Sequence, residues 1–259
     1  MRGALEIGLA GQFDAGKNRL AFTKLDLANP GLLTLSASGY YDLEASRLAA
    51  DLQADIADLS IFRAISGLDL SGAGRVAVKN VVWGAENKKS GRADIEITAG
   101  QLGLGQADLN RLVGPQPVIA AEVELSPQMN LGVRLNRLET AMASGAGSVD
   151  IVNEFKDIRV GCEITVQPGA IPPAIGVTMV QAAHLTAALE GPLNAPAGDI
   201  RLSLPKLAAG GERFDNLVLA TSLTWSEDGV LSLSNRVDFA LRKQPYRLRA
   251  EVVLPPDRM

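Results

Sequence analysis

The sequence predicts an all-β fold: a long, curved antiparallel sheet that forms an open trough and carries one or two short helices. Polar and apolar residues alternate along about fifteen short runs, and turn-forming residues separate these runs about every 8–15 residues. Hydrophobic residues make up 47% of the 259 positions but aromatic residues only 4%, so alanine, leucine and valine supply most of the apolar surface. This composition favours thin layers over one thick core.

Two similar stretches, SGAGRVAVKN at residues 71–80 and SGAGSVDIVN at residues 144–153, agree at six of ten positions. Alternating apolar residues follow the glycines each time. Because glycine tolerates a positive φ, each SGAG is expected to form a tight turn that leads into a strand. The repetition indicates recurring β units, since the echoes in the chain share no single period.

Helical patterns are scarce. Residues 58–67 begin with a capping Asp58, carry apolar positions at helical spacing and end at Gly67, which predicts a short helix. Residues 106–114 show the same pattern before Gly114. We expect both segments to lie at the edge of a sheet.

The other runs are expected to be strands. Alternation is clearest at residues 92–100, 121–126, 199–204, 231–241 and 246–254. Residues 175–189 alternate at first and then become rich in alanine, so strand and helix both stay open there. A strand with one apolar face must press that face on something, and a sandwich, a barrel or a trough would each do so.

The chain is expected to be one continuous repetitive segment, residues 1–259, with sub-units at about 1–66, 67–140 and 141–259. It opens without the apolar core of a signal peptide and stops just after a strand pattern, so we expect a segment of a longer protein. No window of about 18 uninterrupted apolar residues predicts a membrane span. The net charge of −4 disfavours a nucleic-acid partner, which requires a basic face.

The residues that carry chemistry are few. His184 is the single histidine and Cys162 the single cysteine, and neither has the companions that a metal site or an activated nucleophile needs. We expect a surface histidine, a structural cysteine, no cofactor and no enzymatic activity. Glu122 and Glu124 share one strand face, and paired carboxylates run glycoside hydrolysis only where they converge in a cleft.

Trp83 and Trp225 each end an alternating run just before a turn. The favoured interpretation is a residue that covers the rim of a sheet. The other interpretation is an amphipathic side chain at the mouth of an apolar groove.

Three stretches together resemble the TamB family and the wider AsmA-like superfamily. They are ISGLDLSGAG at residues 65–74, LGLGQADLNRLVGPQPVIAAEVELSP at 102–127 and LTAALEGPLNAPAGDIRLSLPKLAAGGERFDNLVLATSLTW at 185–225. The middle stretch is similar to the family's short helix that ends before a strand, and the last to its recurrent L-x-G-x-L-x-x-P-x-G unit. The resemblance covers most of residues 52–254.

The resemblance implies a protein anchored in the inner membrane of a diderm bacterium, whose curved sheet crosses the periplasm with a hydrophobic inside. Such proteins are the inner-membrane subunit of the translocation and assembly module and support outer-membrane protein and lipid biogenesis. They shield phospholipid acyl chains in the groove and partner an outer-membrane barrel of the Omp85 type. We expect the anchor and the partner-binding domain to lie outside this segment.

The first functional hypothesis is therefore a non-enzymatic segment of a periplasm-spanning bridge, with acyl chains on the apolar strand faces. Alternation alone assigns these faces, and a register error of one residue would invert a strand. The residues expected to line the groove are Ile95, Ile97, Val123, Leu125, Ile200, Leu202, Leu204, Leu231, Leu233, Leu248 and Val252. The alternative is a structural β-sandwich or adhesin-like repeat module whose core is closed and dry.

Overall fold

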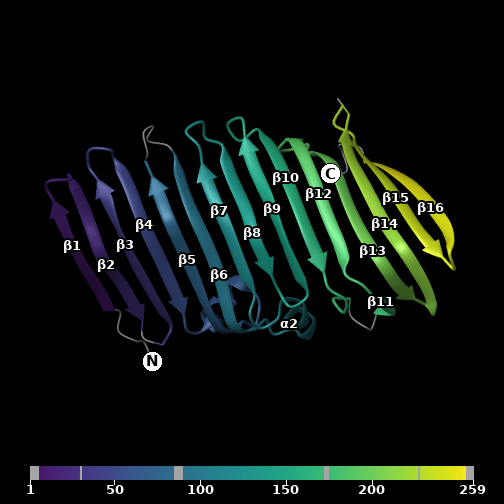
Figure 1. Cartoon of the computed structure of the whole chain (residues 1–259), viewed down its shortest axis with the longest axis horizontal. Helices are drawn as coiled ribbons and strands as arrows, with labels where there is room; N and C mark the ends of the chain where they lie inside the picture. Colours follow the sequence, from purple (N-terminus) through teal and green to yellow (C-terminus); the bar gives the residue numbers. More distant parts are fainter. Residues whose placement is uncertain (1–5, 30, 85–89, 172–174, 227, 255–259) are drawn as a thin grey trace. The chain divides into compact units, whose positions relative to one another are not determined.

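The computed structural model of the chain describes residues 6–29, 31–84, 90–171, 175–226 and 228–254. These residues form sixteen strands that pair antiparallel in open sheets within each of two units (Figure 1), which confirms the predicted all-β class. Internal contacts divide the chain into two units, Met1–Ala141 and Met142–Met259. The three sub-units expected from the sequence stay a prediction.

Unit 1 is a meander of eight strands, each hydrogen-bonded to the next. Short turns join most of them, so sequence neighbours are also spatial neighbours, as is usual for antiparallel sheets. The strands are β1 (Glu6–Asp14), β2 (Arg19–Asn29), β3 (Leu33–Asp42), β4 (Arg47–Ile56), β5 (Ser71–Trp83), β6 (Gly91–Gly103), β7 (Val118–Leu125) and β8 (Leu131–Glu139).

Unit 2 repeats this plan with one irregularity. Its strands are β9 (Ala143–Val152), β10 (Asp157–Val166), β11 (Val177–Met179), β12 (Ala183–Pro192), β13 (Ala197–Ala209), β14 (Glu212–Trp225), β15 (Leu231–Leu241) and β16 (Gln244–Leu254). Strand β10 pairs directly with β12, while the short β11 pairs with the far end of β13. The segment at residues 175–189, for which strand and helix both stayed open, forms strand at residues 177–179 and 183–189, with a break between them.

Both predicted helices are confirmed. A 3-10 turn, η1 (Leu59–Phe62), runs directly into α1 (Arg63–Ser66), and α2 (Ala107–Val113) forms the second helix. The Asp58 side chain accepts a hydrogen bond from the backbone N–H of Ser60 at 2.9 Å, which caps the first turn. Gly67 ends α1 with a left-handed φ of 69°.

The expected SGAG turns are wrong, because both stretches lie within strands, at the start of β5 and inside β9. Gly72 has a positive φ of 99°, but it sits in a register shift of the β5–β6 pair and not in a hairpin turn. In β9 the glycine instead allows the backbone of the neighbouring strand to come close. A Cβ at Gly145 would lie 2.5 Å from the carbonyl oxygen of Glu163 on the neighbouring strand.

A bulge in β5 keeps the apolar side chains of both halves of the strand on the same face of the sheet. Val78 lies opposite Ile95, and Trp83 lies opposite Gly91. Val78 and Trp83 are five positions apart on β5, whereas their partners are only four positions apart on β6. The extra residue is Asn80, which adopts a φ of 53°. Because side chains alternate between faces, this bulge brings Trp83 to the same face as Val78.

The core is thin. The buried hydrophobic residues are Ala37, Ala77, Ala170, Met179 and Ala183. Among the described residues, no large side chain is less than 2% exposed. A single sheet layer explains this finding because, apart from the end that the helices cover, each strand face has neighbours only within its own layer.

Candidate functional site

The strand register of unit 1 gathers apolar side chains on one face. Residues directly opposite one another on paired strands point to the same side of a sheet, so the pairs can be followed from β1 to β8. Three such rows define the first apolar face. They are Leu9, Leu25, Ala37, Leu52, Val78, Ile95, Ala121 and Leu135; Ile7, Leu27, Leu35, Ala54, Val76, Ile97, Ile119 and Leu138; and Phe13, Leu20, Tyr41, Leu48, Trp83, Gly91, Leu125 and Leu131.

Unit 2 has an equivalent surface, the second apolar face. Two rows of opposed residues define it from β9 to β16. They are Val149, Val160, Leu189, Gly198, Leu223, Leu233 and Val252; and Gly145, Ile164, Leu185, Leu202, Leu219, Val237 and Leu248. Between these rows, Thr221 donates a hydrogen bond to the side-chain oxygen of Asn235 at 2.8 Å, so a satisfied polar pair interrupts the surface.

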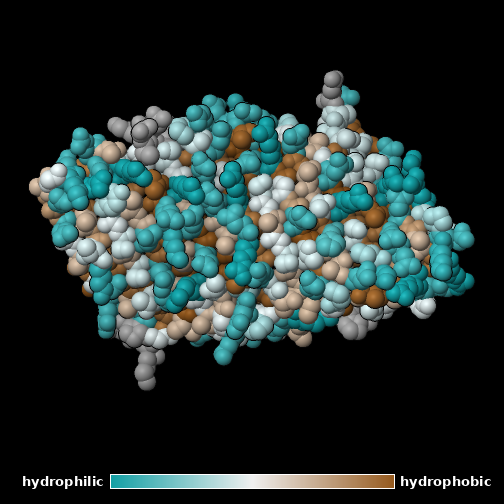
Figure 2. All heavy atoms as spheres, viewed as in Figure 1, coloured by the Kyte–Doolittle hydropathy of each residue, from teal (hydrophilic) through white to brown (hydrophobic). Residues whose placement is uncertain are grey.

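The opposite face of unit 1 is polar and carries cross-strand ion pairs. Arg75 contacts Asp55 at 2.6 Å and Arg92 contacts Glu122 at 3.2 Å. Figure 2 shows hydrophilic side chains spread over the face turned to the viewer, with hydrophobic residues visible between them. Glu122 is thus held by an arginine of the next strand, and it lies on a sheet surface together with Glu124.

The apolar faces are open to solvent to an unusual degree. Leu9 is 75% exposed, Ile97 41% and Leu248 60%. The chain exposes 16168 Å² in total, whereas a globular monomer of 27.2 kDa would expose about 10,900 Å². Even two separate globular domains of half that mass would together expose only about 13,100 Å². Large apolar side chains therefore remain in contact with water.

Seven of the eleven groove residues predicted from alternation belong to these rows: Ile95, Ile97, Leu125, Leu202, Leu233, Leu248 and Val252. The other four, Val123, Ile200, Leu204 and Leu231, each lie two positions from a row member on the same strand and so point to the same side. Their role in binding stays a prediction. Within each unit the described strands form one layer. The alternative of a structural β-sandwich or adhesin-like repeat module with a closed dry core stays a prediction.

A cavity of about 560 Å³ lies where the helices cover one end of the first apolar face. Leu59 and Phe62 of η1 and Val113 of α2 form its outer wall, and Val76, Ile97 and Ile119 belong to the sheet side. Sequence analysis placed the helices at a sheet edge but missed this cavity. The apolar residues of the first helix at helical spacing were the available signal, although Ile65 of that set is 85% exposed.

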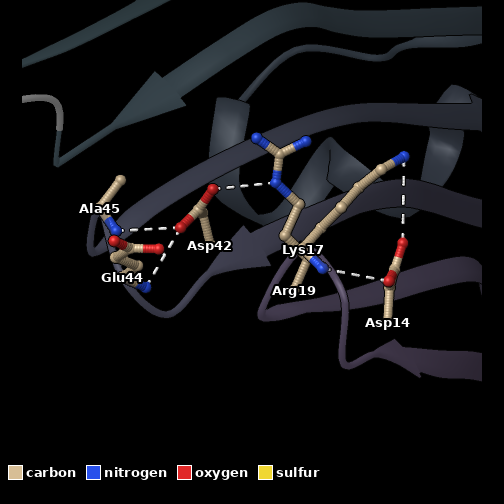
Figure 3. A network of polar contacts seen from close by, with 6 residues as sticks. All are labelled: Asp14, Lys17, Arg19, Asp42, Glu44 and Ala45. Carbon is tan, nitrogen blue, oxygen red and sulfur yellow. Dashed lines mark hydrogen bonds and ion pairs between the residues drawn. The ribbon is translucent and has the colours of Figure 1, made fainter.

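The hairpin turns of unit 1 are stabilised by a polar network (Figure 3). Asp42 accepts hydrogen bonds from the backbone N–H groups of Ala45 at 2.9 Å and Glu44 at 3.1 Å, and from Arg19 Nε at 2.9 Å. The Ala45 N–H and the Arg19 guanidinium hold the pKa of Asp42 below its ordinary value. Arg19 also stands over the Tyr40 ring, 4.7 Å from its centroid. The network fixes the turn between β3 and β4.

The remaining single residues lie where structural roles explain them. His184 is exposed on β12 with its Nδ1 3.2 Å from Thr165 Oγ1, and Cys162 is a half-buried free thiol on the apolar side of β10. Trp225 donates its indole N–H to the Pro196 carbonyl oxygen at 2.9 Å. Trp83 is 49% exposed at the end of β5, so its place at the rim suits either interpretation.

In the described part of the chain, no three His, Cys, Asp or Glu side chains are grouped so that they could hold a metal ion. No helix of these residues has the length and hydrophobicity to cross a membrane. Comparisons with protein-family models, with curated proteins and with solved structures find no match. The open apolar faces and the cavity are the candidate site, because large apolar side chains are exposed on the faces and line the cavity.

Proposed function

We propose that this chain is a segment of a non-enzymatic bridge protein that shields hydrocarbon chains of phospholipids on its apolar strand faces. The observation that carries the proposal is the exposure of large apolar side chains along whole rows of paired strands. Exposed apolar patches of this extent mark binding surfaces in folded proteins. The hydrophobic effect has no preferred direction, so a surface of leucine, isoleucine and valine can bind an acyl chain at any position along the strands and let it move along the surface.

The scarcity of polar groups on the apolar face supports lipid shielding over the binding of another protein. The apolar rows of unit 1 run across eight strands with few polar groups, whereas protein interfaces carry about one hydrogen bond per 100–200 Å². Each methylene group that leaves water on such a surface gains about 0.8 kcal/mol. An acyl chain needs no hydrogen-bond partner, so it can match the surface at any position.

The proposed setting is the periplasm of a diderm bacterium, in a protein anchored in the inner membrane and related to the TamB and AsmA-like families. Its role there would be outer-membrane lipid and protein biogenesis. The proposed partners are phospholipids, which contact this segment, and an outer-membrane Omp85-type barrel, which contacts other parts of the protein. The order of short helices and alternating strands supports the proposed relationship.

Site-specific photo-crosslinking in a bacterial periplasm tests the proposal. A photoreactive residue is introduced at three apolar positions and at three neighbouring polar positions, and adducts are identified by mass spectrometry after purification without detergent. The apolar positions are Ile97, Val123 and Leu202, and the opposite-face controls are Glu96, Glu124 and Arg201. Phospholipid adducts confined to the apolar set are expected. Equal labelling of both sets, or no lipid at all, would exclude lipid shielding by this segment.

A further inference from the structure

We propose that the cavity beneath the two helical segments is a bounded site for the end of one straight hydrocarbon chain. This inference rests on the proposed function and adds a defined pocket to the open face. Its volume of about 560 Å³ lies within the range of small-molecule pockets, about 300–1,000 Å³. The pocket would hold one chain end, while the open face beyond it sets no such limit.

Two small residues of the sheet create the space. Gly74 of β5 lies directly opposite Ala99 of β6, so neither strand sends a large side chain into the gap at this point. The gap is narrow above Gly74, since a Cβ built there would lie 3.2 Å from Leu59 Cδ2. Leu59 of η1 therefore lies close over the backbone at Gly74, while larger side chains such as Val76 and Ile97 line the sheet side around the two small residues.

The walls offer an occupant almost only apolar contacts. Leu59, Phe62 and Val113 line the helical side, and Ile97 and Ile119 line the sheet side. These side chains provide dispersion contacts and no hydrogen-bond partner, so a polar ligand would lose its bonds to water without replacement.

The single charged residue among the lining residues, Arg75, is already matched. Its Nε lies 2.6 Å from Asp55 Oδ1, which pairs the charge on the polar side of the sheet. An anionic headgroup would have to compete with Asp55 for this guanidinium. The pocket therefore selects the chain of a ligand and not its headgroup.

A hydrocarbon chain fits better than a compact apolar molecule because the pocket is continuous with the first apolar face. Val76, Ile97 and Ile119 line the pocket, and the same residues form one row of that face across neighbouring strands. A chain can thus place its end in the pocket and continue over the open rows. A compact ligand would leave this exit unused.

The length dependence of binding distinguishes a bounded pocket from an open surface. Each methylene taken up by the pocket should raise affinity about fourfold. Once the pocket is full, the gain per methylene should fall to a lower plateau, because the open face covers only one side of the chain. Saturated fatty acids and lysophosphatidylethanolamines of increasing chain length are titrated against the whole chain below their micelle concentrations. We expect the gain per methylene to reach this plateau at one chain length, with one ligand bound, and a fourfold gain that continues at every length would overturn the pocket.

The two ligand series identify the source of the chain. A shared plateau means that the pocket accepts either ligand, binding of the fatty acids alone assigns a free fatty acid, and binding of the lysolipids alone assigns a phospholipid chain. Failure of both series to bind would overturn the proposal, as would native mass spectra that show another protein or a second copy in place of a ligand.

A matched pair of variants tests the location. Ala99 and Ala93 lie on the same strand and the same face, but only Ala99 lines the cavity. Ala99→Leu should lower affinity at least tenfold and shorten the plateau length, while Ala93→Leu should change neither. Leu59→Ala, which enlarges the cavity, should move the plateau to longer chains. Equal effects of the two leucine variants would overturn the assignment.

Failure of this inference can be told apart from failure of the proposed function. Val123 and Leu202 lie outside the cavity, and lipid adducts there report on the open faces alone. Adducts at these residues without a length plateau would remove the pocket and keep lipid shielding. Circular dichroism and thermal unfolding confirm that each variant is folded before its binding is compared.

Discussion

Asp42 shows how a single residue stabilises a sheet whose core is thin. Its carboxylate accepts two backbone N–H groups of the turn between β3 and β4, and it also pairs with Arg19 on the neighbouring strand β2 (Figure 3). These bonds favour the charged form, which is why the pKa of Asp42 is lowered in the folded chain. The turn is thus coupled to pH through one group.

The pH dependence of Asp42→Asn tests this coupling. Because the folded pKa lies below the unfolded value of about 3.9, the charge contributes stability above that value and loses it as pH falls through the folded pKa. Wild type should melt at a higher temperature than Asp42→Asn at pH 7, and the difference should shrink below about pH 4. Melting curves at pH 7 and pH 2.5 measure it, and a constant difference would contradict the role of the charge.

Strand β5 shows how a single element keeps one apolar and one polar face along its whole length. Asn80 occupies the bulge with a φ of 53°, donates its side-chain amide to Asp94 at 2.6 Å, and its backbone N–H donates to Asp51 at 2.8 Å. Asparagine tolerates the left-handed region better than other residues with a Cβ. The bulge is therefore specified by both its backbone and its partners on two neighbouring strands.

Two substitutions at Asn80 separate these contributions. Asn80→Gly and Asn80→Ala both remove the hydrogen bond to Asp94, but only alanine is strained at a positive φ. Asn80→Ala should be less stable than Asn80→Gly by about 1–2 kcal/mol, measured by urea unfolding. Equal stabilities would mean that the bulge relaxes when its side chain is lost.

At the scale of the whole molecule, the large exposed surface should appear in the unfolding behaviour. The urea m-value grows with the surface that unfolding exposes, and this chain already exposes 16168 Å² when folded. Its m-value should be about one fifth smaller than that of a globular protein of 27.2 kDa. Equilibrium unfolding followed by circular dichroism measures it.

A ligand that covers the apolar faces should also change the urea m-value. Occupied faces leave less apolar surface in water in the native state, so bound lipid should raise both stability and the m-value. A lipid-free sample that already shows the full m-value of a globular protein would indicate that the apolar faces are covered in solution. The comparison of lipid-free and lipid-loaded samples is its own control.

Much of the architecture could be predicted from local pattern. Ile95 and Ile97 alternate with Glu96, and the structure places the isoleucines on the apolar face and the glutamate on the other. Asp58 and Gly67 likewise marked the first helix correctly. Such signals succeed because side-chain direction in a strand and capping at a helix end depend on a few neighbouring residues.

The sequence by itself determined the two-sided strands and the short helices, because alternation and capping are local. Only the tertiary structure decided which residues of separate strands meet. It set Gly74 beside Ala99 beneath Leu59, which opens the cavity, and it turned the SGAG stretches from expected turns into strand. These outcomes follow from hydrogen-bonded register between distant segments, and a single run of residues carries no information about the partner strand.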